Sequence, residues 1–470
     1  MSNGSSERIA EALRTWISTA PAGAKLPSTR ALVAQHSASP VTVQQALRLL
    51  AAQGLVETRP GAGTFVLAAR TARPHDYGWQ TSALGTPPRR VHGGPAALRT
   101  TPVDTIALHA GYPDRELLPE RLVRPALTRA ARSDAAVTRP PAAGTAELRA
   151  WFAAELSALA LPHISAPTAN DVVVLPGSQS GLSAVFRALV GEGGTLLIES
   201  PTYWGAILAA EQTGVRLIPI TSSPNGPDPE ELDRAFAQTG ARAFYAQPSF
   251  ANPTGACWSP ELSRQVLEVV RERRAFLIED DWAHDFGITA DASPLAAQDE
   301  NGHVVWLRSL TKSVSPAVRV AGLIARGPAR DRIRAEAEAQ SLYISGVLQA
   351  AALDVVTQPA WRTHLRGLRR ELQSRRDLLA GALREHASSV CLDALPHGGL
   401  NLWVRVPDST DLSELTRDCG ARGLLIAGGD AWFPAEPTGR FLRLSFAGPD
   451  PGAYPEAARI LEAALSEQRG

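Results

Sequence analysis

The chain has 470 residues, 44% of them apolar and 20% charged, and its 47 basic and 47 acidic side chains leave no formal net charge. This composition is typical of a globular protein of two or three domains, and no run approaches the roughly 18 uninterrupted apolar residues of a membrane-spanning helix, so we expect a cytoplasmic protein. Cys257, Cys391 and Cys419 are odd in number and widely spaced, which argues against a disulfide framework and against a metal site.

The charge is unevenly distributed along the chain. Residues 1–103 contain eleven Lys or Arg and four Asp or Glu, a balance of +7, which leaves −7 for residues 104–470. A basic N-terminal region ahead of a mildly acidic body indicates a polyanionic partner for the first region.

Three short amphipathic helices are expected near the N-terminus, followed by a hairpin. Ile9, Leu13 and Ile17 fall on one helical face, and the segments KLPSTRALVAQHS and SPVTVQQALRLLAAQG have the spacing of two further helices. In LVETRPGAGTFVLA, two β-rich runs flank a turn made of Pro and Gly. Three helices and a wing are the plan of a winged helix-turn-helix domain (α+β), which we expect over residues 1–68.

The segments LPSTRALV, VTVQQAL and GLVETRPGAGTFV resemble the DNA-binding domain of the GntR regulators over nearly all of residues 5–67. In such a fold the third helix enters the major groove and the wing contacts phosphate or the minor groove. Glutamine can bond an adenine edge in a bidentate manner, so we expect Gln44 or Gln45 to read a base, with Arg30 and Arg59 contacting phosphate. The candidate DNA-binding residues are Arg30, Thr42, Gln44, Gln45, Arg48 and Arg59.

One position departs from the GntR pattern. Pro40 stands where the family usually has an arginine just before the threonine. Proline starts a helix well but cannot donate to a base, so the operator sequence cannot be taken from relatives. The alternative that the winged helix serves only protein contacts stays open.

Residues 69–103 are expected to form a flexible linker. They contain many Pro and Gly residues and show no sustained periodicity. Such a linker allows the first domain to move relative to the body, or to reach a partner subunit.

From about residue 170 the sequence alternates short β-rich runs with helical runs, which predicts an α/β domain with a mostly parallel sheet within residues 104–470. In open sheets of this kind ligands bind beyond the carboxyl ends of the strands. The polar residues after the predicted strands are therefore the candidates: Gly177, Ser178, Gln179, Tyr203, Asn252, Asp280, Asp281, Ser309, Lys312 and Arg319.

Lys312 is one of two lysines in a chain with 45 arginines. A lysine can lose its proton when buried and attack a carbonyl carbon to form a Schiff base, which an arginine cannot do. The helix start at Gly177 can hold a phosphate through free backbone amides and the helix dipole. Each feature alone also has an ordinary explanation, because an arginine-biased genome leaves few lysines and a Gly-Ser helix start is often only a turn.

Together these residues fit pyridoxal 5′-phosphate, which needs an amine, an anion cradle, a carboxylate on its ring nitrogen, a donor to its phenolic oxygen and an aromatic cover. The order GSQ, SPTYWG, NPTG, EDDW, SLTK and RLSFA resembles the fold-type I, class I aminotransferases over residues 105–465. The resemblance implies a Schiff base at Lys312, Asp280 on the ring nitrogen and Asn252 on the phenolic oxygen. Arg443 in RFLRLSFA matches the arginine that grips a substrate or effector carboxylate. The implied phosphate site and ring cover are formed by Gly177, Ser178, Gln179, Ser309, Arg319 and Tyr203.

A winged helix joined through a linker to an aminotransferase-like body is the arrangement of the MocR subfamily of GntR regulators, which the chain resembles over almost its whole length. The resemblance implies a homodimer that binds a double-stranded DNA operator and senses pyridoxal 5′-phosphate, or a small amine or amino-acid effector, through Lys312. Two alternatives stay open: a catalytically active aminotransferase with an accessory DNA-binding domain, and a body that binds no cofactor and only dimerises.

The motifs give opposing indications on whether the chain catalyses transamination. Trp282 stands where these regulators usually have a tyrosine, and TRPPAAGTAELR lacks the tyrosine common before Gly144. Both departures limit the enzyme chemistry that follows from the resemblance. Asn252 in NPTG, by contrast, is closer to true aminotransferases than to many regulators.

Overall fold

The computed structural model divides into two compact units, residues 1–90 and 91–470. Most of the expected linker, residues 69–103, lies outside the described residues. None of the described helices combines the length and the apolar character needed to cross a membrane. The structure describes residues 4–67, 79–80, 83, 101–102, 104–448 and 450–469.

The N-terminal unit is a winged helix-turn-helix, as predicted. Ser28 and Ser39 cap the second and third helices through their hydroxyl oxygens, and Pro40 occupies the first turn of the third. The helices and the wing strands bury one small apolar core that includes Leu32 and Val43. The elements are α1 (Ser5–Thr19), α2 (Thr29–His36), α3 (Pro40–Ala52), β1 (Val56–Arg59) and β2 (Gly63–Val66).

The body is built on an eight-stranded sheet with the order β4-β11-β10-β9-β8-β5-β6-β7. The pairs between β10 and β6 are all parallel, whereas β11 runs antiparallel to both of its neighbours and β7 runs antiparallel to β6. The predicted mostly parallel α/β sheet is therefore confirmed. The strands are β4 (Val172–Leu175), β5 (Thr195–Ser200), β6 (Arg216–Ser223), β7 (Gly226–Pro227), β8 (Ala243–Ala246), β9 (Phe276–Asp281), β10 (Val304–Ser309) and β11 (Ala321–Ile324).

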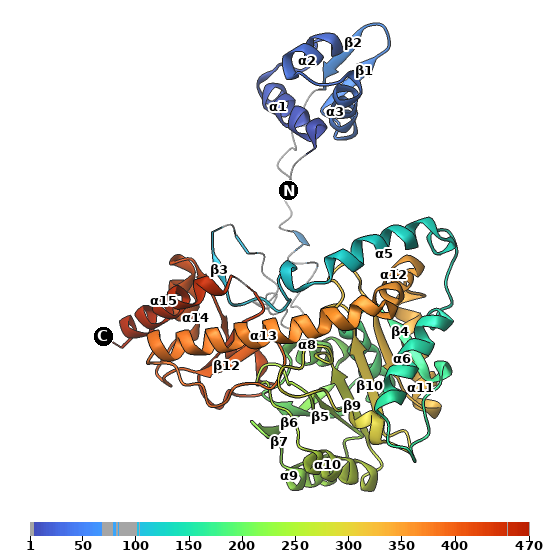
Figure 1. Cartoon of the computed structure of the whole chain (residues 1–470), viewed down its shortest axis with the longest axis vertical. Helices are drawn as coiled ribbons and strands as arrows, with labels where there is room; N and C mark the ends of the chain where they lie inside the picture. Colours follow the sequence, from blue (N-terminus) through green and yellow to red (C-terminus); the bar gives the residue numbers. More distant parts are fainter. Residues whose placement is uncertain are drawn as a thin grey trace. The chain divides into compact units, whose positions relative to one another are not determined.

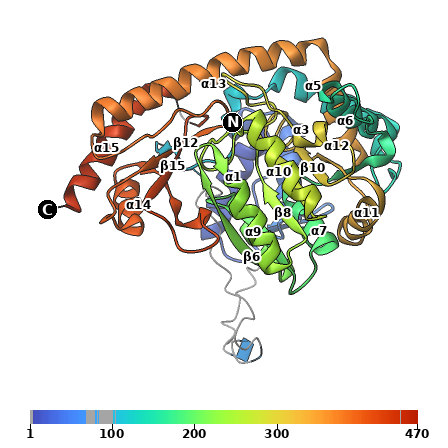
Figure 2. The same ribbon diagram turned by 90° about the horizontal axis from the view of Figure 1, so that it is seen from below.

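Helices cover both faces of this sheet (Figures 1 and 2). One apolar cluster joins the sheet to α7, α8 and α11 on one face, and two further clusters join it to the other helices on the opposite face. Strands buried on both faces explain the nearly continuous apolar runs of the sequence. The helices are α5 (Glu120–Arg132), α6 (Ala146–Leu159), α7 (Ser178–Leu189), α8 (Trp204–Thr213), α9 (Pro229–Thr239), α10 (Pro260–Glu272), α11 (Gly327–Ser341) and α12 (Gly346–Thr357).

A smaller C-terminal layer completes the body. The 28-residue helix α13 (Pro359–His386) runs from the large sheet to this layer, as Figures 1 and 2 show. Its three-stranded antiparallel sheet has the order β12-β15-β14. A short parallel pair, β3 with β13, ties the segment that precedes α5 to the same layer. The remaining elements are β3 (Ile106–Ala107), β12 (Asn401–Arg405), α14 (Leu412–Ala421), β13 (Leu424–Leu425), β14 (Ala427–Gly428), β15 (Phe441–Ser445) and α15 (Tyr454–Glu467).

Candidate functional site

A cavity of about 170 Å³ lies at the carboxyl ends of the parallel strands. The strand ends supply its walls, as expected for an open α/β sheet. It brings together nine of the predicted residues: Ser178, Gln179, Tyr203, Asn252, Asp280, Ser309, Lys312, Arg319 and Arg443. Gly177 directly precedes the helix whose first residues line the cavity.

Lys312 follows β10, and its Nζ lies 4.1 Å from the centroid of the Trp282 ring. Burial and the guanidinium of Arg443 lower the pKa of the Lys312 amine to about 7, although the carboxylate of Asp280 opposes the shift. A large fraction of the amine is therefore neutral near pH 7, which is the form that attacks a carbonyl carbon.

Asp280 presents one unsatisfied oxygen to the cavity. Its Oδ2 accepts hydrogen bonds from Tyr245 Oη (2.8 Å) and Gln247 Nε2 (2.9 Å). Its Oδ1 is buried and has no hydrogen-bond partner among the residues that the structure describes. Burial raises the pKa of this carboxyl to about 6, against the effect of the two donors and of Lys312. A buried acceptor without a partner costs roughly 1–3 kcal/mol, and the protonated ring nitrogen of a pyridine would satisfy it.

Asn252 is held in one orientation. Its Oδ1 accepts a hydrogen bond from Trp432 Nε1 (3.2 Å), and its backbone N–H donates to Gln247 Oε1 (2.8 Å). The side chain lines the cavity, and no partner for its Nδ2 is found in the described part of the chain. The amide group is therefore available to donate to a phenolic oxygen in the cavity.

Trp282 cannot replace the tyrosine that the resemblance leads one to expect. Its Nε1 donates to the carbonyl oxygen of Phe250 at 3.2 Å, so its polar group is used within the protein. What Trp282 offers to the cavity is the face of its ring, against Lys312. An ammonium over an aromatic face is stabilised, but the ring donates no hydrogen bond to a ligand.

The start of α7 is shaped as an anion cradle. Gly177 has a φ of +93°, and a Cβ at this position would lie 2.8 Å from Arg319 Nη2. Glycine therefore allows the guanidinium of Arg319 to approach the backbone where α7 begins at Ser178. Ser309 lines the same cavity from the end of β10. Free amides, the helix dipole and a guanidinium suit a phosphate group.

Gln179 has a different contact from the predicted one. Its side-chain Nε2 donates to the carbonyl oxygen of Gly205 (2.8 Å), and its Oε1 accepts from Tyr203 Oη (3.2 Å). The side chain thus fixes the tyrosine ring that is expected to cover a cofactor, and a contact between Gln179 and phosphate is left to the backbone amide.

Arg443 is a buried cation without a carboxylate partner among the described residues. Its Nη2 donates to the carbonyl oxygens of His109 (2.7 Å) and Ala110 (2.9 Å), and its Nε is buried without a partner in the described ranges. Burial lowers the pKa of its guanidinium to about 10. Since an unpaired buried charge is unfavourable, a ligand carboxylate fits this position.

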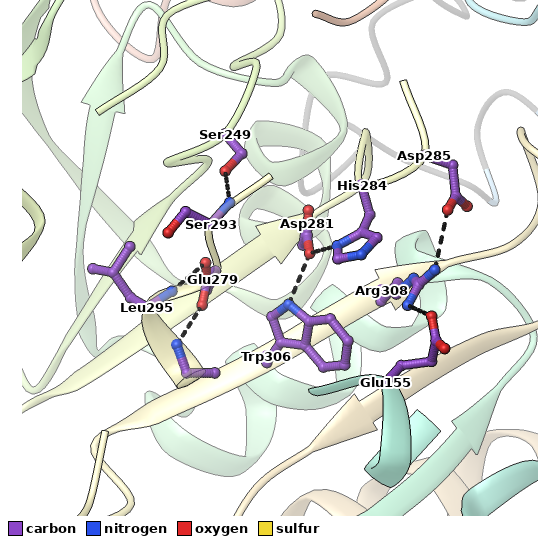
Figure 3. A network of polar contacts seen from close by, with 11 residues as sticks. Glu155, Ser249, Glu279, Asp281, His284, Asp285, Ser293, Leu295, Trp306 and Arg308 are labelled. Atoms are coloured by element: carbon purple, nitrogen blue, oxygen red, sulfur yellow. Dashed lines mark hydrogen bonds and ion pairs between the residues drawn. The ribbon is translucent and has the colours of Figure 1, made fainter. Parts of the chain in front are cut away.

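Asp281 follows Asp280 on β9, so its side chain lies on the opposite face of the sheet from the cavity. Figure 3 shows it beside His284 and Trp306. Its Oδ2 accepts hydrogen bonds from His284 Nδ1 (2.6 Å) and Trp306 Nε1 (3.0 Å). Burial opposes its charge, but His284, Arg308 and Trp306 together hold the pKa of the carboxyl below its usual value.

A second buried charge lies beside Asp281 on this face. The guanidinium of Arg308 contacts Glu155 (3.0 Å) and Asp285 (3.1 Å), as Figure 3 shows. Of the three adjacent carboxylates on β9, Glu279, Asp280 and Asp281, only Asp280 lines the cavity.

The predicted DNA-binding residues of α3 differ in exposure. Gln44, Gln45 and Arg48 are exposed, whereas Thr42 is half-buried. The backbone N–H of Thr42 donates to Ser39 Oγ (3.2 Å), and its hydroxyl lies 2.9 Å from the same oxygen. The exposed side chains are thus available to a partner, while Thr42 is already part of the helix cap.

The two predicted phosphate contacts are both exposed. Arg30 lies at the start of α2. Arg59 lies in the wing, where its Nε and Nη2 donate to Glu57 (3.1 and 3.0 Å) and its guanidinium sits 5.1 Å from the Phe65 ring centroid. A phosphate contact by Arg59 therefore competes with Glu57.

The sequence analysis did not name several residues on the exposed face of α3 and in the cavity. Val41 is 67% exposed at the start of α3, where an apolar side chain can contact a thymine methyl. Its place beside Pro40 in a recognition helix is a signal that the sequence contained. The cavity also includes Gly111, Tyr112, Trp204, Gln247 and Thr311.

Known proteins share both parts of this chain. Residues 105–461 match the family model of aminotransferase class I and II, and residues 5–66 match that of bacterial regulatory proteins, gntR family. The HTH-type transcriptional regulator YdfD of Bacillus subtilis is 26% identical over 435 residues, which are 91% of this chain and 89% of that protein. The probable rhizopine catabolism regulatory protein MocR of Rhizobium meliloti is 26% identical over 451 residues, 94% of this chain and 90% of that protein.

Among solved structures, the body is similar to LysN, an alpha-aminoadipate aminotransferase from Thermus thermophilus, with a TM-score of 0.72 and 26% identity over 78% of this chain and 93% of that chain. The family and the fold indicate binding of pyridoxal 5′-phosphate, and the orphaned Asp280 oxygen, the cradle at Gly177 and the amine of Lys312 fit that cofactor. The chain belongs to the aminotransferase class I and II family, in the MocR-type architecture that places a GntR DNA-binding domain before the aminotransferase-like body.

Proposed function

We propose that this DNA-binding regulator senses pyridoxal 5′-phosphate, or an amino compound through it, by means of the side-chain nitrogen of Lys312. Arg443 holds the carboxylate of an amino-acid effector in this proposal. Bound in the cavity, the cofactor would supply an aldehyde carbon that reacts with amines and a ring that withdraws electrons. Asp280 keeps the ring nitrogen protonated, Asn252 donates to the phenolic oxygen, and the start of α7 holds the phosphate.

One observation carries the proposal. A single cavity contains an amine of lowered pKa, a carboxylate with an unpartnered oxygen and a buried arginine without a counter-ion in the described residues, and the same chain contains a winged helix with an exposed recognition helix. Groups that are unsatisfied within the protein, and that converge on one cavity, indicate a ligand site.

The assembly and its setting belong to the same proposal. We expect residues 1–68 to bind a DNA operator, residues 69–103 to link, and residues 104–470 to bind the cofactor and form a homodimer. Because the partner is DNA, the cytoplasm is the expected compartment. Sedimentation of the purified chain at several concentrations tests the dimer.

Cofactor attachment can be tested at residue level, because Lys25 is the only other lysine. Wild-type protein with added pyridoxal 5′-phosphate should show a visible absorbance band, and borohydride reduction should add the cofactor mass to the peptide that contains Lys312. Lys312→Ala should remove both signals, and the control Lys25→Ala should keep them. A colourless wild type, or mass on Lys25, would contradict the proposal.

Regulation is tested by DNA binding. A duplex selected from a random-sequence pool by the wild-type chain serves as the operator probe. Its affinity should change on addition of pyridoxal 5′-phosphate or of an amine to the loaded protein, and Lys312→Ala should abolish that response while retaining specific binding. Identical affinities for the wild type under all of these conditions would reject the sensing role.

A catalytically active aminotransferase is the second candidate. The presence of Asn252, Asp280, Lys312 and Arg443 in one cavity favours it. Single-turnover mixing of loaded protein with amino acids tests it, because an enzyme converts the bound cofactor to its amine form at a useful rate. Rapid conversion without any effect on DNA binding would favour the enzyme over the regulator.

A further inference from the structure

Trp432 connects the two groups that are expected to contact the ligand carboxylate and the cofactor. It ends the short 3₁₀ helix Gly429–Trp432 of the C-terminal layer and is 1% exposed. Its Nε1 donates to Asn252 Oδ1 at 3.2 Å, and its ring centroid lies 5.3 Å from the guanidinium carbon of Arg443. Its carbonyl oxygen accepts a hydrogen bond from Thr202 N (2.8 Å), the residue before Tyr203.

The indole N–H decides which atom Asn252 offers to the cavity. With Oδ1 occupied by Trp432, the donor Nδ2 is the group left for a phenolic oxygen. The connection continues through the side chain of Gln247. Its Oε1 accepts a hydrogen bond from Asn252 N, and its Nε2 donates a hydrogen bond to Asp280 Oδ2. A hydrogen-bonded chain that starts at Trp432 therefore ends at the carboxylate expected to hold the ring nitrogen.

Arg443 is the ligand-binding end of this arrangement. Its hydrogen bonds go to the backbone carbonyls of His109 and Ala110, and its Nε lacks a partner among the described residues. A carboxylate that binds the guanidinium competes with those carbonyls and with the face of the Trp432 ring. Because the ring and the N–H belong to one rigid indole, a shift of the ring alters the bond to Asn252.

We propose that Trp432 is a positioning residue that couples binding of a ligand carboxylate at Arg443 to the hydrogen bond that Asn252 offers to the cofactor. The coupling names the class of effector, a compound with a carboxylate beside its amine, and it rests on the function proposed above. It explains why the C-terminal layer supplies a polar contact to the cofactor side of the cavity.

The test uses full-length protein loaded with pyridoxal 5′-phosphate. It measures the midpoint of the pH titration of the visible absorbance band, with and without propionate. Propionate is a carboxylate that lacks an amine, so it can occupy Arg443 without reacting; propionamide is the uncharged control. In the wild type, propionate should raise the midpoint, because it offsets the cation that lowers the pKa of the Lys312 amine and loosens the donor at Asn252.

Trp432→Phe keeps an aromatic face over Arg443 and removes the N–H. Its midpoint without propionate should lie about half to one pH unit above that of the wild type, since one hydrogen bond that favours the ionised phenolic oxygen is weakened. The propionate-dependent rise should shrink, while the propionate dissociation constant stays within about threefold.

Trp403→Phe is the matched control. Trp403 packs in the same aromatic cluster, with its ring centroid 6.2 Å from that of Trp432. The substitution replaces the same side chain by the same one. It should behave like the wild type. If Trp432→Phe does not fold, 3-benzothienylalanine at position 432 keeps the indole shape and replaces only the N–H by sulfur.

The outcomes separate the two proposals. A normal band in every protein, with the same midpoint and propionate response in Trp432→Phe and Trp403→Phe, overturns the coupling and leaves the cofactor site intact. A colourless wild type overturns both proposals. A raised midpoint with a reduced response in Trp432→Phe alone supports the coupling.

Discussion

Strand β9 carries carboxylates on both faces of the sheet, and its last two residues, Asp280 and Asp281, differ in how their charges are satisfied. On the cavity face, Asp280 has an oxygen with no partner in the described residues and a carboxyl pKa raised to about 6. On the opposite face, Asp281 also has one oxygen, Oδ1, with no partner in the described residues, but His284, Arg308 and Trp306 hold the pKa of its carboxyl below the usual value. Arg308 there contacts two carboxylates (Figure 3). Neighbouring positions on one strand thus carry the same side chain in opposite electrostatic states.

The difference distinguishes residues that bind a ligand from residues that stabilise the fold. Charges that the protein satisfies by itself stabilise the fold, whereas charges that it leaves unsatisfied at a cavity are completed by a ligand. Substitutions at Asp281 and Arg308 should therefore affect the free energy of unfolding, and substitutions on the face that carries Asp280 should affect the cofactor.

The largest effect is expected at Arg308. Arg308→Met leaves the buried carboxylate of Asp285 without its cation, so the free energy of unfolding should fall by about 3–5 kcal/mol. Urea unfolding of the cofactor-free protein measures it. As a control, Arg264→Met removes exposed pairs with Glu261 and Glu268 and should change the free energy of unfolding far less. Equal losses of unfolding free energy in the two variants would mean that the buried Arg308 contributes no more to stability than an exposed arginine.

Asp280 should destabilise the cofactor-free protein as the pH rises. The pKa of its carboxyl goes from 3.8 to about 6 on folding, so the protonated form is favoured in the folded state. The resulting loss of stability is absent below pH 4 and complete above about pH 6. Relative to wild type, Asp280→Asn should gain up to about 3 kcal/mol across that window.

Unfolding curves at pH 4, 5, 6 and 7 check this prediction, which parallel curves for the two proteins would refute. Saturating pyridoxal 5′-phosphate should reverse the order, because it stabilises the wild type and has little to pair with in Asp280→Asn.

Asp281 should show the opposite sign. Its folded pKa lies below the usual value, so its charge adds stability that is present above the unfolded pKa of about 3.8 and is lost as the pH falls through the folded pKa. Asp281→Asn should therefore cost about 1.5–3 kcal/mol at pH 7 and less below pH 4. Thermal melts over this range measure it. If Asp281→Asn is as stable as the wild type at pH 7, the charge of Asp281 does not stabilise the fold, and the contrast with Asp280 is wrong.

The smallest effect is expected at Tyr245. Tyr245→Phe removes one of the two donors to Asp280 Oδ2, a loss of about 0.5–1.5 kcal/mol that should weaken cofactor affinity by roughly two- to tenfold. Absorbance titration with pyridoxal 5′-phosphate measures it. The control Tyr343→Phe, at a tyrosine that is 44% exposed, should leave the affinity unchanged.

The sequence predicted the groups that follow the parallel strands, because every such strand ends at the same edge of the sheet. Lys312, Asp280 and Asn252 could be named in this way. Strand alternation shows that Asp280 and Asp281 face opposite sides, but the choice between them came from the family motif and not from the pattern.

The contacts that the sequence did not reveal join distant segments, although Arg443 itself was named from the family motif. Trp432 contacts a residue 180 positions away, and Arg443 contacts the backbone 334 positions away. Such pairs depend on how the C-terminal layer packs on the large sheet, which no local periodicity encodes. The antiparallel β11 was missed for the same reason, since its apolar run is like those of its parallel neighbours.

The exposed face of α3 carries two amides, one isopropyl group at Val41 and the guanidinium of Arg48. Contacts made by such a face release few counter-ions from DNA, so added salt weakens them little. Discrimination between operator sequences should then persist at ionic strengths that already lower the overall affinity, and the steep part of the salt response should follow the arginines outside this helix, Arg30 and Arg59.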